Sequence, residues 1–269
     1  MTPFRFGPPN RQMYGAYHSG SIARRPSVGV LLCNPFGQEA IRIHRLYRLL
    51  AERLSAEGLH VLRFDYFSTG ESDGEDEQGD LEGWSTDIRT AHAELLRRAR
   101  CSHSVWMGSR LGAALAALAT SPCAEESHPP DRLVLWEPLT DGPTYIRELG
   151  RSHARAIEFA LAPGAGPVDE SLGAEAIGFT VSDELRQQLS MLNLNALVHV
   201  CAREVAILSR PEDASAQALV QALQAHGKAV KAGSLRHDLV WSSEEALGAA
   251  LAPADVLLAL QAQIMDSLQ

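Results

Sequence analysis

Short apolar runs alternate with longer amphipathic segments along most of the chain. The runs VGVLLC, HVLRFD, SVWMGS, RLVLWE and EVAILS are rich in apolar residues, as expected of strands that are buried on both faces of a sheet. Residues 40–57 carry apolar side chains at helical spacing, and a second helix is predicted over residues 84–100. Strands and helices that alternate in this way predict βαβ units and a parallel sheet, preceded by a hairpin over residues 3–20.

Residues 139–200 break this alternation. Helical patterns over residues 144–161 and 182–194 flank a loop, and the block is too long for a single crossover between strands. We therefore predict an α/β core formed by residues 1–138 and 201–269, into which residues 139–200 are inserted as a helical cap or lid.

The alternation resumes after this block. The EVAILS run is followed by a predicted helix over residues 214–226 and a short strand near residues 229–235. A last helix is predicted over residues 244–268, interrupted near Pro253 because proline breaks helical hydrogen bonding. The sheet is therefore expected to continue into the C-terminal third of the chain.

Composition narrows the class of protein without defining its chemistry. Of 269 residues, 45% are hydrophobic and 21% are charged, as is usual for a soluble globular protein, and the net charge of −9 argues against a nucleic-acid surface. No apolar run reaches the roughly 18 residues of a membrane span, and the N-terminus lacks the layout of a signal peptide. The four cysteines form no C-x-x-C pair, which predicts reduced thiols in a cytoplasmic protein rather than disulfides or a zinc site. They are Cys33, Cys101, Cys123 and Cys201.

Three motifs follow the predicted strands, namely PFGQE (35–39), FDYFSTGES (64–72) and GSRLGA (108–113). With these motifs in this order, the chain resembles the α/β-hydrolase superfamily and, within it, the serine-aminopeptidase-like bacterial hydrolases. It is similar to a subgroup that includes the exosortase-system-associated hydrolases of the second type, although Ser68 stands where relatives tend to have glycine. The resemblance covers nearly the whole chain and is weakest across residues 150–200. It implies an α/β-hydrolase fold, with a mostly parallel, doubly wound sheet and an inserted helical cap.

The GSRLGA motif can be aligned in two registers with G-x-S-x-G, the strained strand-to-helix turn that exposes the nucleophile in this superfamily. Gly108 and Gly112 as flanks place Arg110 at the apex, whereas Ser109 at the apex would place a methionine and a leucine at the flanks. The flanks must be small because the helix crosses close to the strand, and overpacking costs about 1–3 kcal/mol per site. The spacing favours Arg110 at the apex, and the subgroup also carries arginine where the superfamily has its nucleophile.

In this fold the nucleophile, the acid and the histidine follow one another along the chain. Asp213 and His237 have the order and spacing of the acid and the histidine, with Ser109 as the nucleophile. The oxyanion hole would use the backbone N–H of Leu111, the residue after the apex, and one from the loop that contains Phe36 and Gly37. Asp213 can instead cap the following helix, and His237 can be an ordinary loop histidine.

Arg110 cannot itself attack a carbonyl group, because its guanidinium stays protonated at any working pH. Its planar fork can hold a carboxylate or a phosphate, or it can form a structural ion pair. Glu39 is a candidate partner for such a pair if its loop folds over the turn.

Three hypotheses remain open. The chain is a serine hydrolase or acyl transferase that acts through Ser109, Asp213 and His237. Alternatively, it is a non-catalytic hydrolase-fold protein that binds a ligand or a protein partner through Arg110 and the cap. In the third hypothesis, His237 and Asp213 act as a general base without a covalent intermediate. The expected ligand is a small acyl, ester, amide or carboxylate compound; no cofactor, metal or nucleic acid is implied, and a homodimer is left open.

Overall fold

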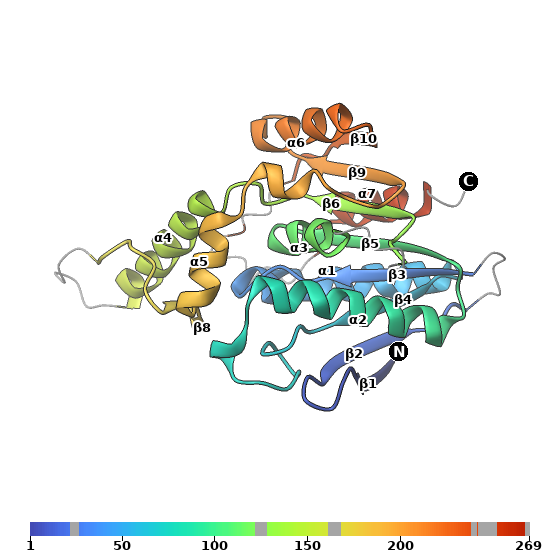
Figure 1. Ribbon diagram of the computed structural model, residues 1–269, viewed down its shortest axis with the longest axis horizontal. Helices are drawn as coiled ribbons and strands as arrows, with labels where there is room; N and C mark the ends of the chain where they lie inside the picture. Colours follow the sequence, from blue (N-terminus) through green and yellow to red (C-terminus); the bar gives the residue numbers. More distant parts are fainter. Residues whose placement is uncertain (22–26, 122–127, 161–167, 238–240, 242–251, 267–269) are drawn as a thin grey trace.

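A mostly parallel sheet forms the centre of the computed structural model, which describes residues 1–21, 27–121, 128–160, 168–237, 241 and 252–266. Within these residues, eight strands pair in the order β1-β2-β4-β3-β5-β6-β9-β10 (Figure 1). Their bounds are β1 (Thr2–Phe6), β2 (Met13–His18), β3 (Val28–Cys33), β4 (His60–Phe64), β5 (His103–Ser109), β6 (Arg132–Trp136), β9 (Glu204–Ser209) and β10 (Ala229–Ser234). The hairpin β1–β2 is antiparallel and joins β4 in antiparallel pairing, whereas the pairs from β4 to β10 are parallel. The predicted parallel sheet is confirmed.

Helices cover both faces of the sheet. The helices α1 (Gln38–Ala56) and α7 (Ala254–Met265) share one apolar core with Val30 and Leu32, and the other face packs against α2 (Leu81–Ala99), α3 (Leu111–Ala119) and α6 (Ala214–Ala225). The neighbouring residues Leu31 and Cys33 belong to that second core. Successive side chains of a strand point to opposite faces, so the continuous apolar run of β3 supplies both cores at once. In Figure 1, α2 and α3 lie on the near side of the sheet and α7 on the far side.

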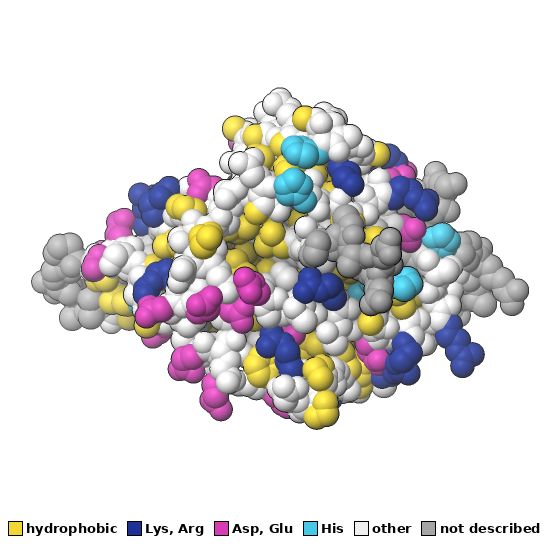
Figure 2. All heavy atoms as spheres, viewed as in Figure 1, with side chains coloured by type: hydrophobic (Ala, Val, Ile, Leu, Met, Phe, Trp, Pro, Cys, Tyr) yellow, Lys and Arg dark blue, Asp and Glu magenta, His cyan; other side chains and the backbone are white. Residues whose placement is uncertain are grey.

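The inserted segment between β6 and β9 forms the helical cap. It contains α4 (Gly142–Ala160), the short antiparallel pair β7 (Glu175–Ala176) and β8 (Phe179–Thr180), α5 (Asp183–Met191) and the 3₁₀ helix η2 (Leu194–Leu197). The helices α4 and α5 lie together beyond one end of the sheet (Figure 1, left). Figure 2 shows that Asp and Glu side chains gather on this side of the molecule. A further 3₁₀ helix, η1 (Asp76–Gln78), precedes α2.

Two expectations from the sequence need qualification. Cys201 is disulfide-bonded, so the prediction of reduced thiols is wrong for this cysteine, whereas Cys33 and Cys101 are free. Cys123 and residues 244–251 of the predicted last helix lie outside the described residues. In the part of the chain that is described, no helix is long and apolar enough to cross a membrane, and no group of three or more His, Cys, Asp or Glu side chains is placed to hold a metal ion.

Candidate functional site

Several parallel strands end at the same edge of the sheet, where clefts of open α/β sheets usually form. The segment after β3 contains Phe36 and Gly37, and β5 leads into Arg110. At the end of β6 stands Glu137, and His237 follows β10. These residues come from distant parts of the chain, and the parallel pairing of their strands brings them to one edge.

Arg110 lies in the turn between β5 and α3 with φ 51° and ψ −122°, a conformation that non-glycine residues rarely adopt. A Cβ on Gly108 would stand 2.4 Å from the carbonyl oxygen of Gly112. One on Gly112 would stand 2.4 Å from the carbonyl oxygen of Asn34. The close approach of α3 to β5 and to the segment after β3 therefore requires glycine at both positions.

The Arg110 side chain is held by two carboxylates. Its Nε donates to Glu39 Oε1 at 3.0 Å, and its Nη2 donates to Glu148 Oε2 at 2.6 Å. Tyr145 Oη also donates to Glu39, at 3.2 Å. The side chain of Glu39 is 8% exposed and that of Glu148 is 48% exposed, so the first pair is buried and the second borders solvent. The predicted pairing with Glu39 is confirmed, and Glu148, which lies on α4, adds a bond between the turn and the cap.

Electrostatics at this pair follow from burial. Burial raises the pKa of the Glu39 carboxyl group, and the adjacent Arg110 opposes that rise only in part. For Arg110, burial lowers the pKa, but Glu39 and Glu148 outweigh it and the net shift is upward. The guanidinium is thus firmly charged, and its charge is already balanced by protein carboxylates.

Ser109 is fully buried, with 0% of its surface exposed. Its Oγ lies 2.9 Å from Tyr47 Oη, and Tyr47 Oη donates to the carbonyl oxygen of Cys33 at 3.2 Å. The single Tyr47 hydroxyl proton has both oxygens within reach, so either hydroxyl can be the donor in the bond that Ser109 and Tyr47 share. The Ser109 hydroxyl group is therefore engaged by a side chain of α1 inside the core.

His237 contacts Glu137, which was not among the residues predicted from the sequence. Its Nε2 lies 3.0 Å from Glu137 Oε1, and its ring meets Trp136 edge-on, with 5.6 Å between centroids. Glu137 also accepts hydrogen bonds from Arg210 Nε, at 3.1 Å, and from Trp241 Nε1. Burial raises the pKa of Glu137, but the contacts with His237, Trp241 and Arg210 outweigh burial and lower it.

Asp213, the acid predicted from the sequence, caps α6. Its carboxylate accepts a hydrogen bond from the backbone N–H of Ala216 at 3.0 Å. The structure thus gives each of the three predicted catalytic residues its own partner: Tyr47 for Ser109, the α6 N-terminus for Asp213 and Glu137 for His237. The position of Glu137, directly after the buried RLVLW strand, is the sequence signal that could have found it.

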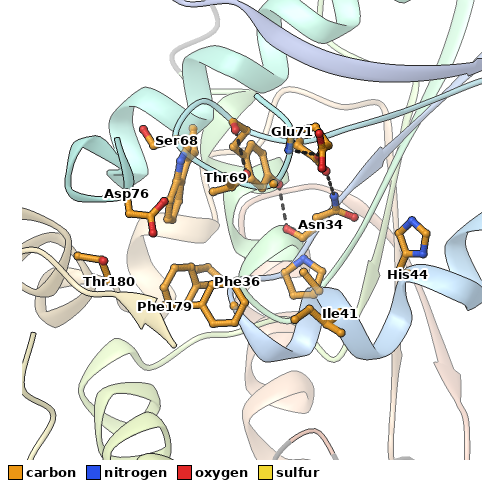
Figure 3. A pocket seen from close by; sticks show the side chains of 18 of the residues that line it. Asn34, Phe36, Ile41, His44, Ser68, Thr69, Glu71, Asp76, Phe179 and Thr180 are labelled. Atoms are coloured by element: carbon orange, nitrogen blue, oxygen red, sulfur yellow. Dashed lines mark hydrogen bonds between the residues drawn. The ribbon is translucent and has the colours of Figure 1, made fainter. Parts of the chain in front are cut away.

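An apolar cavity of about 440 Å³ opens beside the segment after β3 (Figure 3). All three residues predicted to surround the oxyanion hole, Phe36, Gly37 and Leu111, line this cavity. Trp84 from α2 and Phe179 from β8 line it as well, so the core and the cap both contribute walls. We call it the apolar cavity.

A second cavity, of about 460 Å³, lies on the Arg110 side and also includes Phe36 and Gly37 in its lining. Its described lining contains five arginines and five acidic residues, and we call it the charged cavity. They are Arg42, Arg110, Arg151, Arg155 and Arg210, with Glu39, Glu137, Glu148, Glu212 and Asp213.

Solved structures of known proteins share the fold of this chain, although no protein-family model and no curated protein matches it. An esterase from Pyrococcus furiosus superposes with a TM-score of 0.62 at 15% identity, covering 99% of this chain and 90% of that one. Est1E from Butyrivibrio proteoclasticus, solved with ferulic acid bound, gives 0.61 at 14% identity over 98% and 99% of the two chains. A proline iminopeptidase from Mycobacterium smegmatis gives 0.60 at 11% identity over 98% of both.

The chain has the α/β-hydrolase fold. Arg110 stands in a strained strand-to-helix turn, the kind of turn that carries the nucleophile in α/β hydrolases. The similarity at these identities concerns the fold, so the chemistry has to be argued from the residues of this chain.

Proposed function

We propose that this α/β-hydrolase-fold protein binds a small acyl or ester compound without forming a covalent serine intermediate. One observation carries the proposal: Arg110 occupies the strained turn, while Ser109 is fully buried and hydrogen-bonded to Tyr47. A serine nucleophile must be accessible to substrate and must give its proton to a histidine. The degenerate turn also supports membership of the subgroup with a G-x-R-L-G motif.

The ligand's apolar part is assigned to the apolar cavity, whose volume of about 440 Å³ is in the range of small-molecule sites. A carboxylate group on the ligand would reach Arg110 only by displacing Glu148, the more exposed of its two partners. An uncharged acyl or ester group needs no such exchange, and it is therefore the favoured class.

A second candidate function rests on the contact between His237 and Glu137. A buried carboxylate that holds a histidine is the usual support of a general base. In this candidate, the imidazole of His237 accepts a proton from a water molecule as its oxygen attacks an acyl carbon. The His237 side chain has no exposed surface, so this role requires a movement that admits water to the ring. In this candidate, Glu137 has the role that Asp213 has in the sequence-based hypothesis.

Intact-protein mass spectrometry after incubation with a fluorophosphonate probe tests the proposal. We expect no adduct on the wild-type protein, on Ser109→Ala or on the control Ser102→Ala, which changes an exposed serine. An adduct that disappears only in Ser109→Ala would contradict the proposal. Binding of phenyl butyrate, followed by tryptophan fluorescence, should be the same in wild type and Ser109→Ala.

Turnover separates the second candidate from the first. If His237 is a general base, hydrolysis of p-nitrophenyl butyrate survives Ser109→Ala and falls by roughly 10²-fold or more in His237→Gln and Glu137→Gln. Absence of hydrolysis above the uncatalysed rate supports the non-catalytic function and rejects the general base.

A further inference from the structure

Aromatic rings form much of the wall of the apolar cavity. The ring centroids of Phe36 and Trp84 are 5.8 Å apart, those of Tyr66 and Trp84 are 5.7 Å apart, and those of Phe36 and Phe179 are 6.1 Å apart. The polar atoms of this group already have partners, because Tyr66 Oη donates to the carbonyl oxygen of Asn34 and Trp84 Nε1 to that of Phe67. Trp84 and Tyr66 are only 2% and 3% exposed, so the π surface open to a ligand is that of Phe179 and, to a smaller extent, Phe36.

The charged side chains in the described lining of the apolar cavity are all acidic. Asp65, Glu71 and Asp76 line the cavity, whereas no lysine or arginine occurs among its described lining residues. Asp65 is engaged by the backbone N–H of Glu71 at 3.1 Å, while Asp76 stands on the side of Phe179 and Thr180 (Figure 3). His44, at the opposite side, has a pKa lowered mainly by burial and also by Arg63, while Asp65 opposes the shift.

Aromatic faces next to carboxylates attract cations. The ring quadrupole places negative potential above each face, which attracts an ammonium group. A carboxylate within reach of that ammonium group adds to the electrostatic attraction. A carboxylate ligand would meet three acidic side chains in this lining and no cationic partner. The cavity therefore discriminates by charge as well as by shape.

We propose that the apolar cavity binds a small molecule whose apolar body carries an ammonium group, held over the aromatic rings and beside Asp76. This inference rests on the proposed function, since it names the ligand class of that same site. It concerns binding alone, so it can fail while fluorophosphonate labelling still supports the absence of a serine intermediate. The ammonium group distinguishes the ligand from a free fatty acid, whose carboxylate this lining repels.

Isothermal titration calorimetry with three probes tests the charge preference. The probes are benzyltrimethylammonium, uncharged benzyl alcohol and the anion phenylacetate, which share one aromatic ring. We expect the ammonium to bind about tenfold more tightly than benzyl alcohol, and phenylacetate to bind most weakly. Equal or tighter binding of phenylacetate, no advantage of the ammonium over benzyl alcohol, or no binding of any probe would overturn the proposal.

Two variants locate the site. Asp76→Asn should weaken the binding of benzyltrimethylammonium about threefold to tenfold and leave the binding of benzyl alcohol unchanged. Phe179→Leu should weaken the binding of benzyltrimethylammonium about fivefold. Glu77→Gln is the matched control, because Glu77 is exposed, adjacent in η1 and outside the cavity lining. Its effect should stay below about twofold. Equal losses in Asp76→Asn and Glu77→Gln would reject direct contact and with it the proposed site.

Discussion

The apolar cavity and the charged cavity are nearly equal in volume, about 440 and 460 Å³, and they share Phe36 and Gly37. Their chemistry differs because different strand ends supply their walls. The loop after β4 supplies Tyr66 and its neighbours to the first, whereas the ends of β5 and β6 supply Arg110 and Glu137 to the second. In the charged cavity Arg110 pairs with Glu39 and Glu148, and Arg210 pairs with Glu137. In the apolar cavity, by contrast, the described lining contains no lysine or arginine. A charged lining is thus no measure of ligand-binding capacity.

The largest expected effect comes from the turn on which both cavities depend. In Gly112→Ala the new Cβ would stand 2.4 Å from the carbonyl oxygen of Asn34 and 2.5 Å from that of Cys33. The backbone must move to relieve this overlap, so we expect urea denaturation to show that the free energy of unfolding falls by about 3 kcal/mol or more. Gly173→Ala is the control, because nothing lies within 4 Å of the Cβ it adds, and it should change stability by less than about 0.5 kcal/mol. A Gly112→Ala protein as stable as wild type would show that α3 does not lie this close to the segment after β3.

An intermediate effect is expected in the charged cavity, where Glu137 has a lowered pKa. A carboxyl group whose pKa is lowered by folding contributes stability above its ordinary value of 4.5, and this contribution is lost as the pH falls through the folded-state pKa. Glu137→Gln should therefore cost about 2 kcal/mol at pH 7, from weakened hydrogen bonds to charged groups, and progressively less below pH ~4.5. Urea titrations at several pH values measure this.

The exposed Glu212, in the same cavity, supplies the control for this experiment. Glu212→Gln should leave the pH profile of unfolding close to that of wild type. If Glu137→Gln lowers the free energy of unfolding by the same amount at every pH, the contribution of the Glu137 contacts to stability does not depend on the charge of its carboxylate.

The smallest effect is expected at the apolar cavity, where Ser68 has φ 64°. A left-handed conformation costs a residue with a Cβ roughly 1–2 kcal/mol, and glycine avoids this cost but loses more entropy on folding. Ser68→Gly should therefore be more stable than Ser68→Ala by about 1 kcal/mol, because alanine keeps the Cβ. Thermal unfolding compares the two variants. A more stable alanine variant would show that the backbone at this position is not left-handed.

Local patterns were sufficient to predict most of the elements. The apolar run of β3 matches its observed bounds, Val28–Cys33, because a strand buried on both faces must be apolar throughout. The spacing of Gly108 and Gly112 favoured Arg110 at the turn, where it has φ 51° in the structure. Both inferences depend on residues close together in the chain, whose steric limits do not require knowledge of the rest of the fold.

Partners across the fold could not be predicted in the same way. The hydroxyl groups of Tyr47 and Ser109 meet because α1 packs against the sheet. His237 follows β10 and Glu137 follows β6, and the two residues come together because only β9 lies between these strands in the sheet. Burial in one core and parallel strand order decided these pairs. The local sequence can mark Glu137 as a residue at a strand end, but it does not reveal which side chain it will contact. The sequence by itself determined the sheet and its tight turn, through apolar periodicity and glycine sterics. Only the tertiary structure decided which charges neutralise one another and which cavity is left for a ligand.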